Sequence, residues 1–515
     1  MTSEQRSTIS NSGLTQIMQR LPTRVYSRHA IEPPPFLDVS SPAVRIELTD
    51  QPAEAVGADL IAVAAGPRAV ALGAPERALQ AADPVAIVYS DALELAVLAA
   101  PEDVEGLRTA AARAVRAGRD GATVAWSLDP ALAVGAAEQV RALAEGAVLG
   151  GYDGRRWRRE PPSPGVARFV ICGAAPELAA DAQRAALVAR WTNTARELVD
   201  APANIVTPSE LAARAARLPR LTVQAIDPGQ AGLPALAAVG GSSPEPPLLL
   251  VLSHEPPQVA TTARLALVGK AVTFDTGGYF LKPQSDIIRQ KADMGGGAAV
   301  VAALGAIAEL GLPISVTGVV PACENMLSGT AIHPTDVIDT AAGLTVEVIN
   351  PDAEGRLILA DALWYARDRG ATHLVDLATL TGALRAGMGD LYAGVFSPDP
   401  AWREAIVRAG DASGDLAWPW PLHPRYRPLI ESTVADLRNV AGKGFGYPIV
   451  AATFLAQFAG DGPWAHVDML GPALLDEDRG DAFGRGATGY GVRLLVELAT
   501  RLSDGQAEMA IAAAT

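Results

Sequence analysis

Two short stretches of the chain contain residue types that could bind metal ions and activate water. In "NPDAEGR" (350–356), Asp352, Glu354 and Arg356 alternate with small residues. In an extended segment all three side chains therefore project to one side. A helical pattern, "LILADALWYARD", follows directly, and acidic groups are favoured near a helix N-terminus. Two interpretations are open at this point: a capped helix start with a local ion pair, or one wall of a polar crevice.

The second stretch, "VGKAVTFDTGGYFLKPQSDIIRQKAD" (268–293), contains three of the four lysines of the chain. The other basic residues are almost all arginine. A lysine amine can lose its proton beside a cation and then offer a lone pair, whereas arginine stays protonated. We therefore expect Lys270 and Lys282 to serve chemistry. The pattern gives Lys291 no clear role.

Asp275 and Asp293 bring the number of candidate carboxylates to four. Asp275 is followed by Thr-Gly-Gly, and Asp293 precedes "MGGGAAVVAALGAIAEL", a helical pattern that is apolar almost all round and hence buried. Grouping unpaired carboxylates at low dielectric costs several kcal/mol, which a divalent cation offsets. Solvated surface acids are the simpler alternative, but the flanking glycines and apolar runs argue against them.

The available ligand types restrict the metal. The six histidines are scattered without an HExxH spacing, and the chain has two cysteines, so thiolate and histidine-rich zinc sites are excluded. A carboxylate site for Mn²⁺, Mg²⁺ or Zn²⁺ remains, and four acids plus an amine are enough for two ions.

The elements that must position these groups form an α/β pattern. From about residue 190, apolar runs of strand length end in polar or glycine residues before a helical pattern, as in "LALVG", "ISVTGVV", "HLVDLA" and "WAHVDML". Such runs are typical of strands in a covered, mostly parallel sheet, which binds ligands at the carboxyl ends of its strands. One site assembled from several strand ends is therefore predicted.

The domain boundaries follow from changes in pattern. We expect a flexible Ser-, Thr- and Pro-rich extension over 1–42, a smaller α/β domain over 43–175, a linking helix over 176–199, and a catalytic domain over 200–515 with its central sheet flanked by helices.

Composition narrows the classes of protein. The formal net charge of −15 disfavours a general role on nucleic acid or acidic membranes, which need a basic footprint. Neither a signal peptide nor about 18 consecutive apolar residues is found, and two cysteines suit a reducing compartment. We expect a cytoplasmic protein without a membrane partner.

Several blocks together resemble the leucine (cytosol) aminopeptidase family over residues 190–497. They are "VGKAVTFDTGG", "LKP", "KADM", "ENM", "NPDAEGRL", "DLATLTGA" and "WAHVDMLG". The resemblance implies a dinuclear metallo-aminopeptidase that releases N-terminal amino acids from peptides with a metal-activated water. It also implies two divalent ions per subunit, a bicarbonate and a homohexamer.

The resemblance assigns roles to individual residues. Asp275 and Glu354 would bridge the two metals, Lys270 and Asp293 would complete one site, and Asp352 the other. Lys282 would polarise the substrate carbonyl, and Arg356 would hold the bicarbonate. The residues at positions where the family lines its substrate cleft are Asn350, Met294, Thr379, Leu380 and Gly382.

Two positions of the cleft depart from the family pattern. Gln290 stands where a methionine is usual, and Leu470 where a small alanine is common. We expect a pocket that is shorter and more polar than one built for leucine.

Two other classes of function fit the sequence less well. A non-catalytic scaffold could contact nucleic acid through "GRRWRRE" (154–160), by phosphate contacts and stacking on the tryptophan, although a solvated linker explains the same residues. Metal-dependent phosphoryl transfer would need a phosphate-binding loop, and the chain has no GxxxxGK[ST]. Retention of all the expected ligands favours the aminopeptidase.

Overall fold

The structure is a computed structural model that describes residues 44–65, 67–79, 85–89, 94–99, 101–159, 165–442 and 444–505. The extension expected over 1–42 lies outside the described residues. The chain divides into two compact units, and each is described by itself. Among the described residues, the smaller contains those over 44–194 together with Leu475–Thr488, and the larger contains Ala195–Leu474 and those over 489–505. Both mix helices with strands, which confirms the α/β class.

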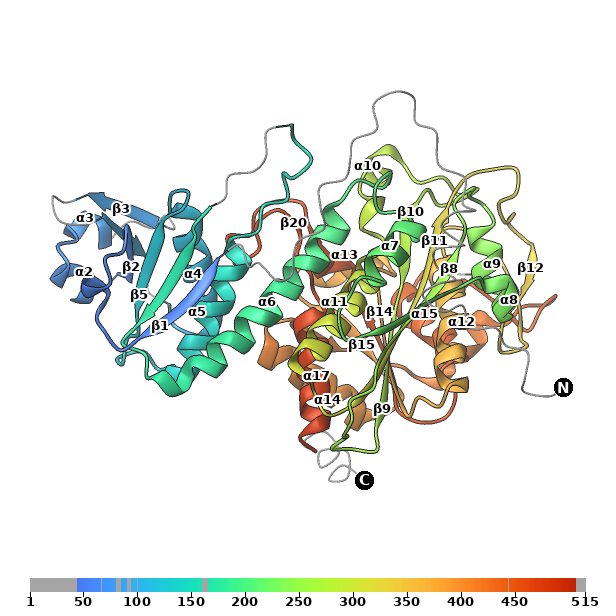
Figure 1. The fold of residues 1–515 in the computed structure, drawn as a ribbon. Coiled ribbons are helices and arrows are strands. Elements are labelled where there is room, and N and C mark those ends of the chain that lie inside the picture. Colours follow the sequence, from blue (N-terminus) through green and yellow to red (C-terminus); the bar gives the residue numbers. More distant parts are fainter. Residues whose placement is uncertain are drawn as a thin grey trace. The chain divides into compact units, whose positions relative to one another are not determined.

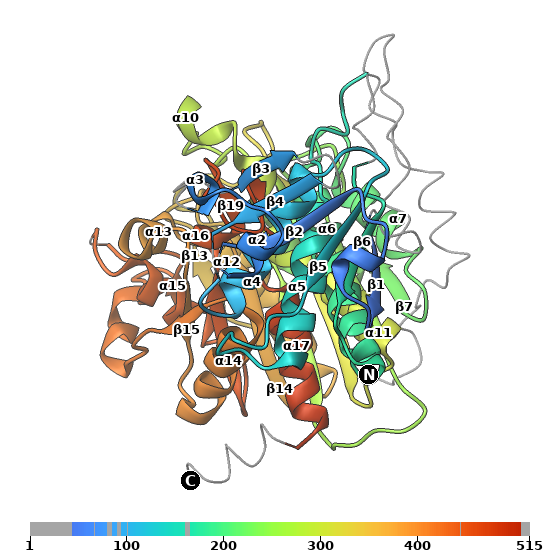
Figure 2. The same cartoon turned by 90° about the vertical axis from the view of Figure 1, so that its left-hand side faces the viewer.

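The smaller unit is built on a six-stranded sheet (Figure 2) in the order β1-β6-β5-β2-β4-β3. Its pairs are parallel except β3 with β4. The strands are β1 (Arg45–Thr49), β2 (Leu60–Ala64), β3 (Val85–Tyr89), β4 (Glu94–Leu98), β5 (Thr123–Ser127) and β6 (Arg168–Cys172). The helices are η1 (Ala53–Ala55), α2 (Pro67–Ala71), α3 (Glu76–Leu79), α4 (Val104–Ala117), α5 (Ala136–Gly150) and η2 (Pro176–Leu178).

Both faces of this sheet are apolar, so alternate residues of one strand enter different cores. Leu60 packs in the core that contains α4 and α5, whereas Ile61 packs in the core that contains α2 and α3. The distant segment Leu475–Thr488 joins the unit because Arg113 and Arg116 of α4 donate hydrogen bonds to its backbone carbonyls. The helix α6 (Ala179–Asp200) begins in this unit and ends in the larger one.

The larger unit contains a nine-stranded sheet in the order β16-β15-β18-β14-β9-β11-β8-β7, with β10 paired to β11. The contiguous strands β10, β11, β9, β14 and β18 run parallel, and antiparallel pairs occur only toward the edges. The strands are β7 (Thr222–Ile226), β8 (Leu248–His254), β9 (Arg264–Gly269), β10 (Ala271–Asp275), β11 (Ser315–Asn325), β14 (His373–Ala378), β15 (Ala393–Phe396), β16 (Ala417–Pro419) and β18 (Trp464–Asp468).

Short strands form two further ladders. One is β12 (Val337–Asp339), β13 (Thr345–Glu347) and β17 (Leu437–Arg438), and the other is β19 (Leu474–Leu475) with β20 (Gly486–Ala487). The remaining helices are α7 (Pro208–Ala215), α8 (Pro228–Ala231), α9 (Pro234–Gly240), α10 (Gln284–Ile287), η3 (Gln290–Ala292), α11 (Gly295–Leu310), α12 (Gly355–Asp368), α13 (Gly382–Met388), α14 (Pro400–Ser413), η4 (Pro424–Ile430), α15 (Tyr447–Leu455), α16 (Leu470–Ala473) and α17 (Val492–Ser503).

Helices cover both faces of the large sheet (Figure 1). The helices α11 and α17 pack together against one face, and α12 with α9 and α15 packs against the other. Central strands such as β18 are buried along their whole length, as a sheet covered on both faces requires. One segment of the described chain, Gln290–Leu310, is long and apolar enough to cross a membrane, but 89% of its most apolar window is buried inside the protein. It is the core helix of this sheet.

Candidate active site

Polar residues lie at the end of the large sheet where its parallel strands have their carboxyl ends. Lys270 follows β9, Asp275 and Asn325 end β10 and β11, and Thr379 follows β14. Strand pairing in register brings these ends together, since Asp275 lies opposite Asn325. The convergence expected from the sequence therefore has a direct cause in the parallel sheet.

Lys270 lies between two buried carboxylates. Its Nζ is 2.7 Å from Asp293 Oδ2 and 2.8 Å from Glu354 Oε1, and it lies 3.4 Å from the Thr379 carbonyl oxygen. Space for this side chain depends on Gly355, where a Cβ atom would lie only 2.6 Å from the Lys270 Nζ. The glycine between Glu354 and Arg356 is thus a packing requirement of the site.

Asp293 is held at the base of α11 by close packing of the helix on the sheet. A Cβ on Gly296 would lie 2.1 Å from the Leu377 carbonyl oxygen, so only glycine permits this approach. The Thr379 hydroxyl donates to Asp293 Oδ1 at 2.8 Å. These contacts fix a carboxylate that is 6% exposed.

Lys282 makes a second pair of ion contacts, with Asp275 at 2.8 Å and with Asp352. Asn325 joins the two halves of the cluster, because its Nδ2 donates to Asp275 Oδ1 at 2.8 Å and lies 3.4 Å from Glu354 Oε2. The two lysines and four acids therefore form one connected cluster.

Burial and ion pairing both shift the pKa values of this cluster. Burial raises the pKa of Asp293 to about 8 and that of Asp352 to about 6, and it raises the pKa of Asp275. For Glu354 the two lysines outweigh burial and lower the pKa. The surrounding carboxylates also outweigh burial at the lysine amines and raise the pKa of Lys270. Such opposed shifts in one pocket are typical of functional sites.

The cluster fits divalent cations. Ligand oxygens of Asp275, Asp293 and Glu354 all lie within 4.8 Å of one another, which is a spacing that one ion could span. Asp293 Oδ2 and Asp352 Oδ1 are buried and accept no well-oriented hydrogen bond from the described residues, although each lies at ion-pair distance from a lysine. Oxygen-rich sites of this kind suit Mn²⁺, Mg²⁺ or Zn²⁺.

Arg356 lies beside the carboxylates on the first turn of α12. Its Nη1 donates to the Asn439 carbonyl at 2.6 Å, while its Nε is buried and has no partner among the described residues. Burial lowers the pKa of this guanidinium to about 10. A buried donor without a partner is costly, so this atom is suited to binding an anion.

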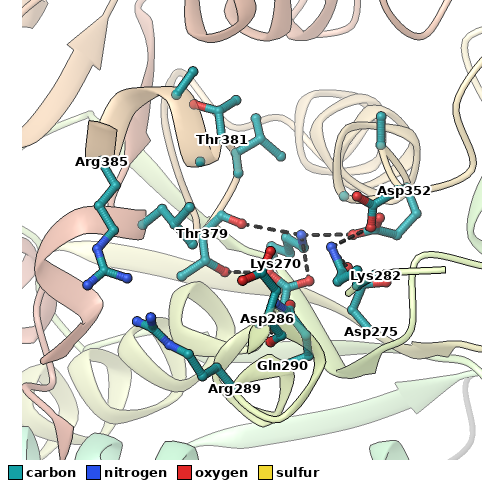
Figure 3. A pocket seen from close by; sticks show the side chains of 18 of the residues that line it. Lys270, Asp275, Lys282, Asp286, Arg289, Gln290, Asp352, Thr379, Thr381 and Arg385 are labelled. Atoms are coloured by element: carbon teal, nitrogen blue, oxygen red, sulfur yellow. Dashed lines mark hydrogen bonds and ion pairs between the residues drawn. The ribbon is translucent and has the colours of Figure 1, made fainter. Parts of the chain in front are cut away.

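The cluster opens into a pocket of about 680 Å³ (Figure 3). Most of the residues expected from the sequence line it: Lys270, Asp275, Lys282, Gln290, Asp293, Asn350, Asp352, Glu354, Arg356, Thr379, Leu380, Gly382 and Leu470. Met294 is not among the described lining residues; it is 1% exposed and lies at the N-cap of α11.

Several residues that support the site were not assigned a role from the sequence. Asn439 accepts hydrogen bonds from the backbone of Ile349 and Asn350 and donates to the Asn350 carbonyl at 2.6 Å. Asn325 ends β11, after an apolar run of strand length, and that position is a signal that could have identified it. Asn439 gives no such signal, because it lies in a loop far along the chain.

Lys291 also has a structural contact. Its Nζ donates to the backbone carbonyl of Asp200, the last residue of α6. The lysine thereby connects η3, which directly precedes Asp293, to the end of a long helix. Lys270 and Lys282, by contrast, form ion pairs with carboxylates.

Known proteins resemble this chain in sequence and in structure. Residues 193–496 match the cytosol aminopeptidase family, catalytic domain. A probable cytosol aminopeptidase of Solibacter usitatus is 42% identical over 364 residues, which cover 70% of this chain and 75% of the relative. A probable cytosol aminopeptidase of Roseiflexus castenholzii is 40% identical over 370 residues, covering 69% and 75%.

Solved structures agree over most of the chain. The bottromycin maturation enzyme BotP in complex with Mn is 35% identical, with a TM-score of 0.79, and the match covers 87% of this chain and all of BotP. A tomato leucine aminopeptidase mutant is 31% identical, with a TM-score of 0.80, covering 90% and 97%. The chain therefore belongs to the cytosol aminopeptidase family of metal-dependent aminopeptidases.

Proposed function

We propose that the pocket removes N-terminal residues from peptides with two divalent cations held by Lys270, Asp275, Asp293, Asp352 and Glu354. The observation that carries the proposal is the connected, buried cluster of four carboxylates and two lysines at the sheet edge. When bound, the cations supply Lewis-acid activation of a water molecule and of the scissile carbonyl. The alternative of a non-catalytic scaffold gains no support, because the expected ligands are all retained in one cluster.

The lysines perform different tasks in this proposal. Lys270 is 3% exposed, and a cation that neutralises Asp293 and Glu354 weakens the contacts that keep its amine protonated, so the amine can act as a ligand. The Lys282 side chain is 15% exposed and lines the pocket. Its compact ammonium stabilises negative charge that develops on the carbonyl oxygen, which is usually the largest contribution in acyl transfer.

Arg356 is proposed to hold a bicarbonate, which would supply a proton acceptor beside the reacting water. Support comes from the buried Nε without a partner among the described residues. Removal of carbon dioxide from the buffer should slow the wild type and leave Arg356→Met, already slow, unchanged. Equal slowing of both proteins would count against this role.

Mn²⁺ or Zn²⁺ is the proposed cofactor, with Mg²⁺ as a weaker substitute, and manganese is present in the structure of BotP. The test is hydrolysis of leucine p-nitroanilide by chelator-treated protein after each metal is added. Activity should return with Mn²⁺ or Zn²⁺, and metal-loaded protein that cleaves no aminoacyl anilide would refute the function.

The assembly and location are proposed from the family. We expect a homohexamer, which sedimentation velocity would distinguish from a monomer of 53.2 kDa. A cytoplasmic location agrees with the relatives, which are named cytosol aminopeptidases.

A further inference from the structure

One end of the active-site pocket contains two arginines that the metal cluster does not use. Arg289 and Arg385 both line the pocket. In Figure 3 they lie on the side of the pocket away from Lys282 and Asp352. They come from separate elements, since Arg289 is the N-cap of η3 and Arg385 lies in α13. We call these two residues the arginine pair.

Polar and charged side chains surround the arginine pair. Gln290 lies next to Arg289, and its Nε2 donates to the Asp286 carbonyl at 3.1 Å. Asp286 also lines the pocket, and its carboxylate accepts a hydrogen bond from Ser285 at 3.1 Å. Asp286 thus lines the same pocket as the two guanidinium groups, and Asp275 and Asp352 of the metal cluster lie on the other side of that pocket (Figure 3).

We propose that the arginine pair binds a carboxylate of the substrate, so that the enzyme prefers a substrate with a carboxylate over the matching amide. The inference rests on the proposed aminopeptidase function. Reaction at the metal cluster fixes the N-terminal residue there, and the pocket must accommodate the remainder of the substrate. The carboxylate comes either from the side chain of an N-terminal glutamate or aspartate, or from the C-terminus of a dipeptide.

Arginine is suited to this task because its planar guanidinium forms two parallel hydrogen bonds with a carboxylate. An amide of the same shape replaces one acceptor oxygen with a donor and has no charge. The kcat/KM of the acid substrate should therefore exceed that of its amide by about tenfold or more. A tenfold ratio needs only the free energy of one modest interaction.

The test compares substrates that differ only in this charge. On Mn²⁺-loaded enzyme, kcat/KM is measured for glutamyl and glutaminyl p-nitroanilide, whose leaving group is neutral. A second comparison uses leucyl-glycine and leucyl-glycinamide, which differ only at the C-terminus. Each pair is measured for wild type, Arg289→Met, Arg385→Met and Arg385→Lys, and for Arg408→Met as a control. Arg408 pairs with Glu404 on an exposed face of α14.

Wild type should prefer the glutamyl over the glutaminyl substrate by about tenfold or more. If this ratio falls toward unity in the methionine variants, the bound carboxylate is that of the N-terminal side chain. The same result in the dipeptide comparison assigns it to the C-terminus. Arg385→Lys should retain part of the preference, Arg408→Met all of it, and raised ionic strength should weaken it.

Ratios near unity for both pairs in wild type would overturn the proposal, as would a preference that survives both arginine substitutions. Neither result affects the proposed function, provided that any of the substrates is cleaved. Failure to cleave every substrate would instead refute the aminopeptidase function itself. A circular dichroism spectrum and a Mn²⁺ titration for each variant show that fold and metal binding are intact.

Discussion

Replacement of Lys270 by methionine should destabilise the metal-free enzyme more than replacement of Lys291 by methionine does. The ammonium contacts Asp293 at 2.7 Å and Glu354 at 2.8 Å, and all three side chains are at most 6% exposed. Lys270→Met keeps the apolar stem but leaves both carboxylates without their shared cation.

The magnitude follows from what is lost. Breaking a buried ion pair by removal of one partner costs about 3–5 kcal/mol. Lys291 provides a matched control, because its ammonium donates to the backbone carbonyl of Asp200 and loss of a hydrogen bond made by a charged group costs about 1.5–3 kcal/mol. Without metal, Lys270→Met should therefore be about 2 kcal/mol less stable than Lys291→Met, which is the difference between the midpoints of the two ranges.

The assay is unfolding of chelator-treated protein, followed by fluorescence of tryptophans such as Trp402 and Trp464, which are fully buried in the larger unit. Saturating Mn²⁺ should recover most of the stability of Lys270→Met, since the cation neutralises the same carboxylates. The required Mn²⁺ concentration should be at least about tenfold higher than for wild type, because one ligand is missing. Equal destabilisation of the two variants without metal would refute the ion-pair reasoning.

Four further predictions test the rest of the site. Lys282→Arg should bind Mn²⁺ as wild type does but lose about 100-fold or more in kcat; loss of metal in a titration would contradict this role. Asn439→Ala should cost about 1–3 kcal/mol in the unfolding assay and weaken Mn²⁺ binding, whereas a change confined to kcat would be unexpected. Gly355→Ala should weaken Mn²⁺ binding in a folded protein, since the new Cβ would lie 2.6 Å from the Lys270 Nζ; unchanged affinity would contradict the packing argument. Calorimetric Mn²⁺ affinity should rise with pH between about 5 and 8 and release protons, because Asp293 and Asp352 have pKa values of about 8 and 6 and must ionise to bind; a flat profile would disprove proton competition.

The sequence was sufficient to predict the fold class and the membership of the polar cluster. The runs "LALVG" and "HLVDLA" end where β9 and β14 end, whereas β11 continues past its run to Asn325 and β18 ends at Asp468, two residues before the end of its run. Parallel strands bring such ends to one side of the sheet. Lys270 and Asp275 could be placed on that side from the chain alone. The alternation of Asp352, Glu354 and Arg356 with small residues likewise predicted that these three side chains lie on one side of the site.

Contacts between distant segments could not be predicted in this way. Asn439 contacts the 350–356 segment through hydrogen bonds that close a loop of more than 80 residues, and nothing in its local pattern marks it. The stretch Leu475–Thr488 belongs to the smaller unit, although the sequence placed it in the catalytic domain by continuity. Helical and strand periodicity report only local order, whereas these contacts depend on tertiary packing.

The lysines of the 268–293 stretch illustrate how local chemistry and packing combine. Lone-pair chemistry explains why an amine is needed at Lys270, but an arginine is also excluded by space. Gly355 approaches so closely that even a methyl group would lie 2.6 Å from the ammonium, and a guanidinium is wider still. Lys282 lies in a more open position and is 15% exposed, so chemistry rather than space should restrict it. The Lys282→Arg variant is therefore expected to fold and to bind metal. The Lys270→Arg variant is expected to fold poorly and to bind metal poorly.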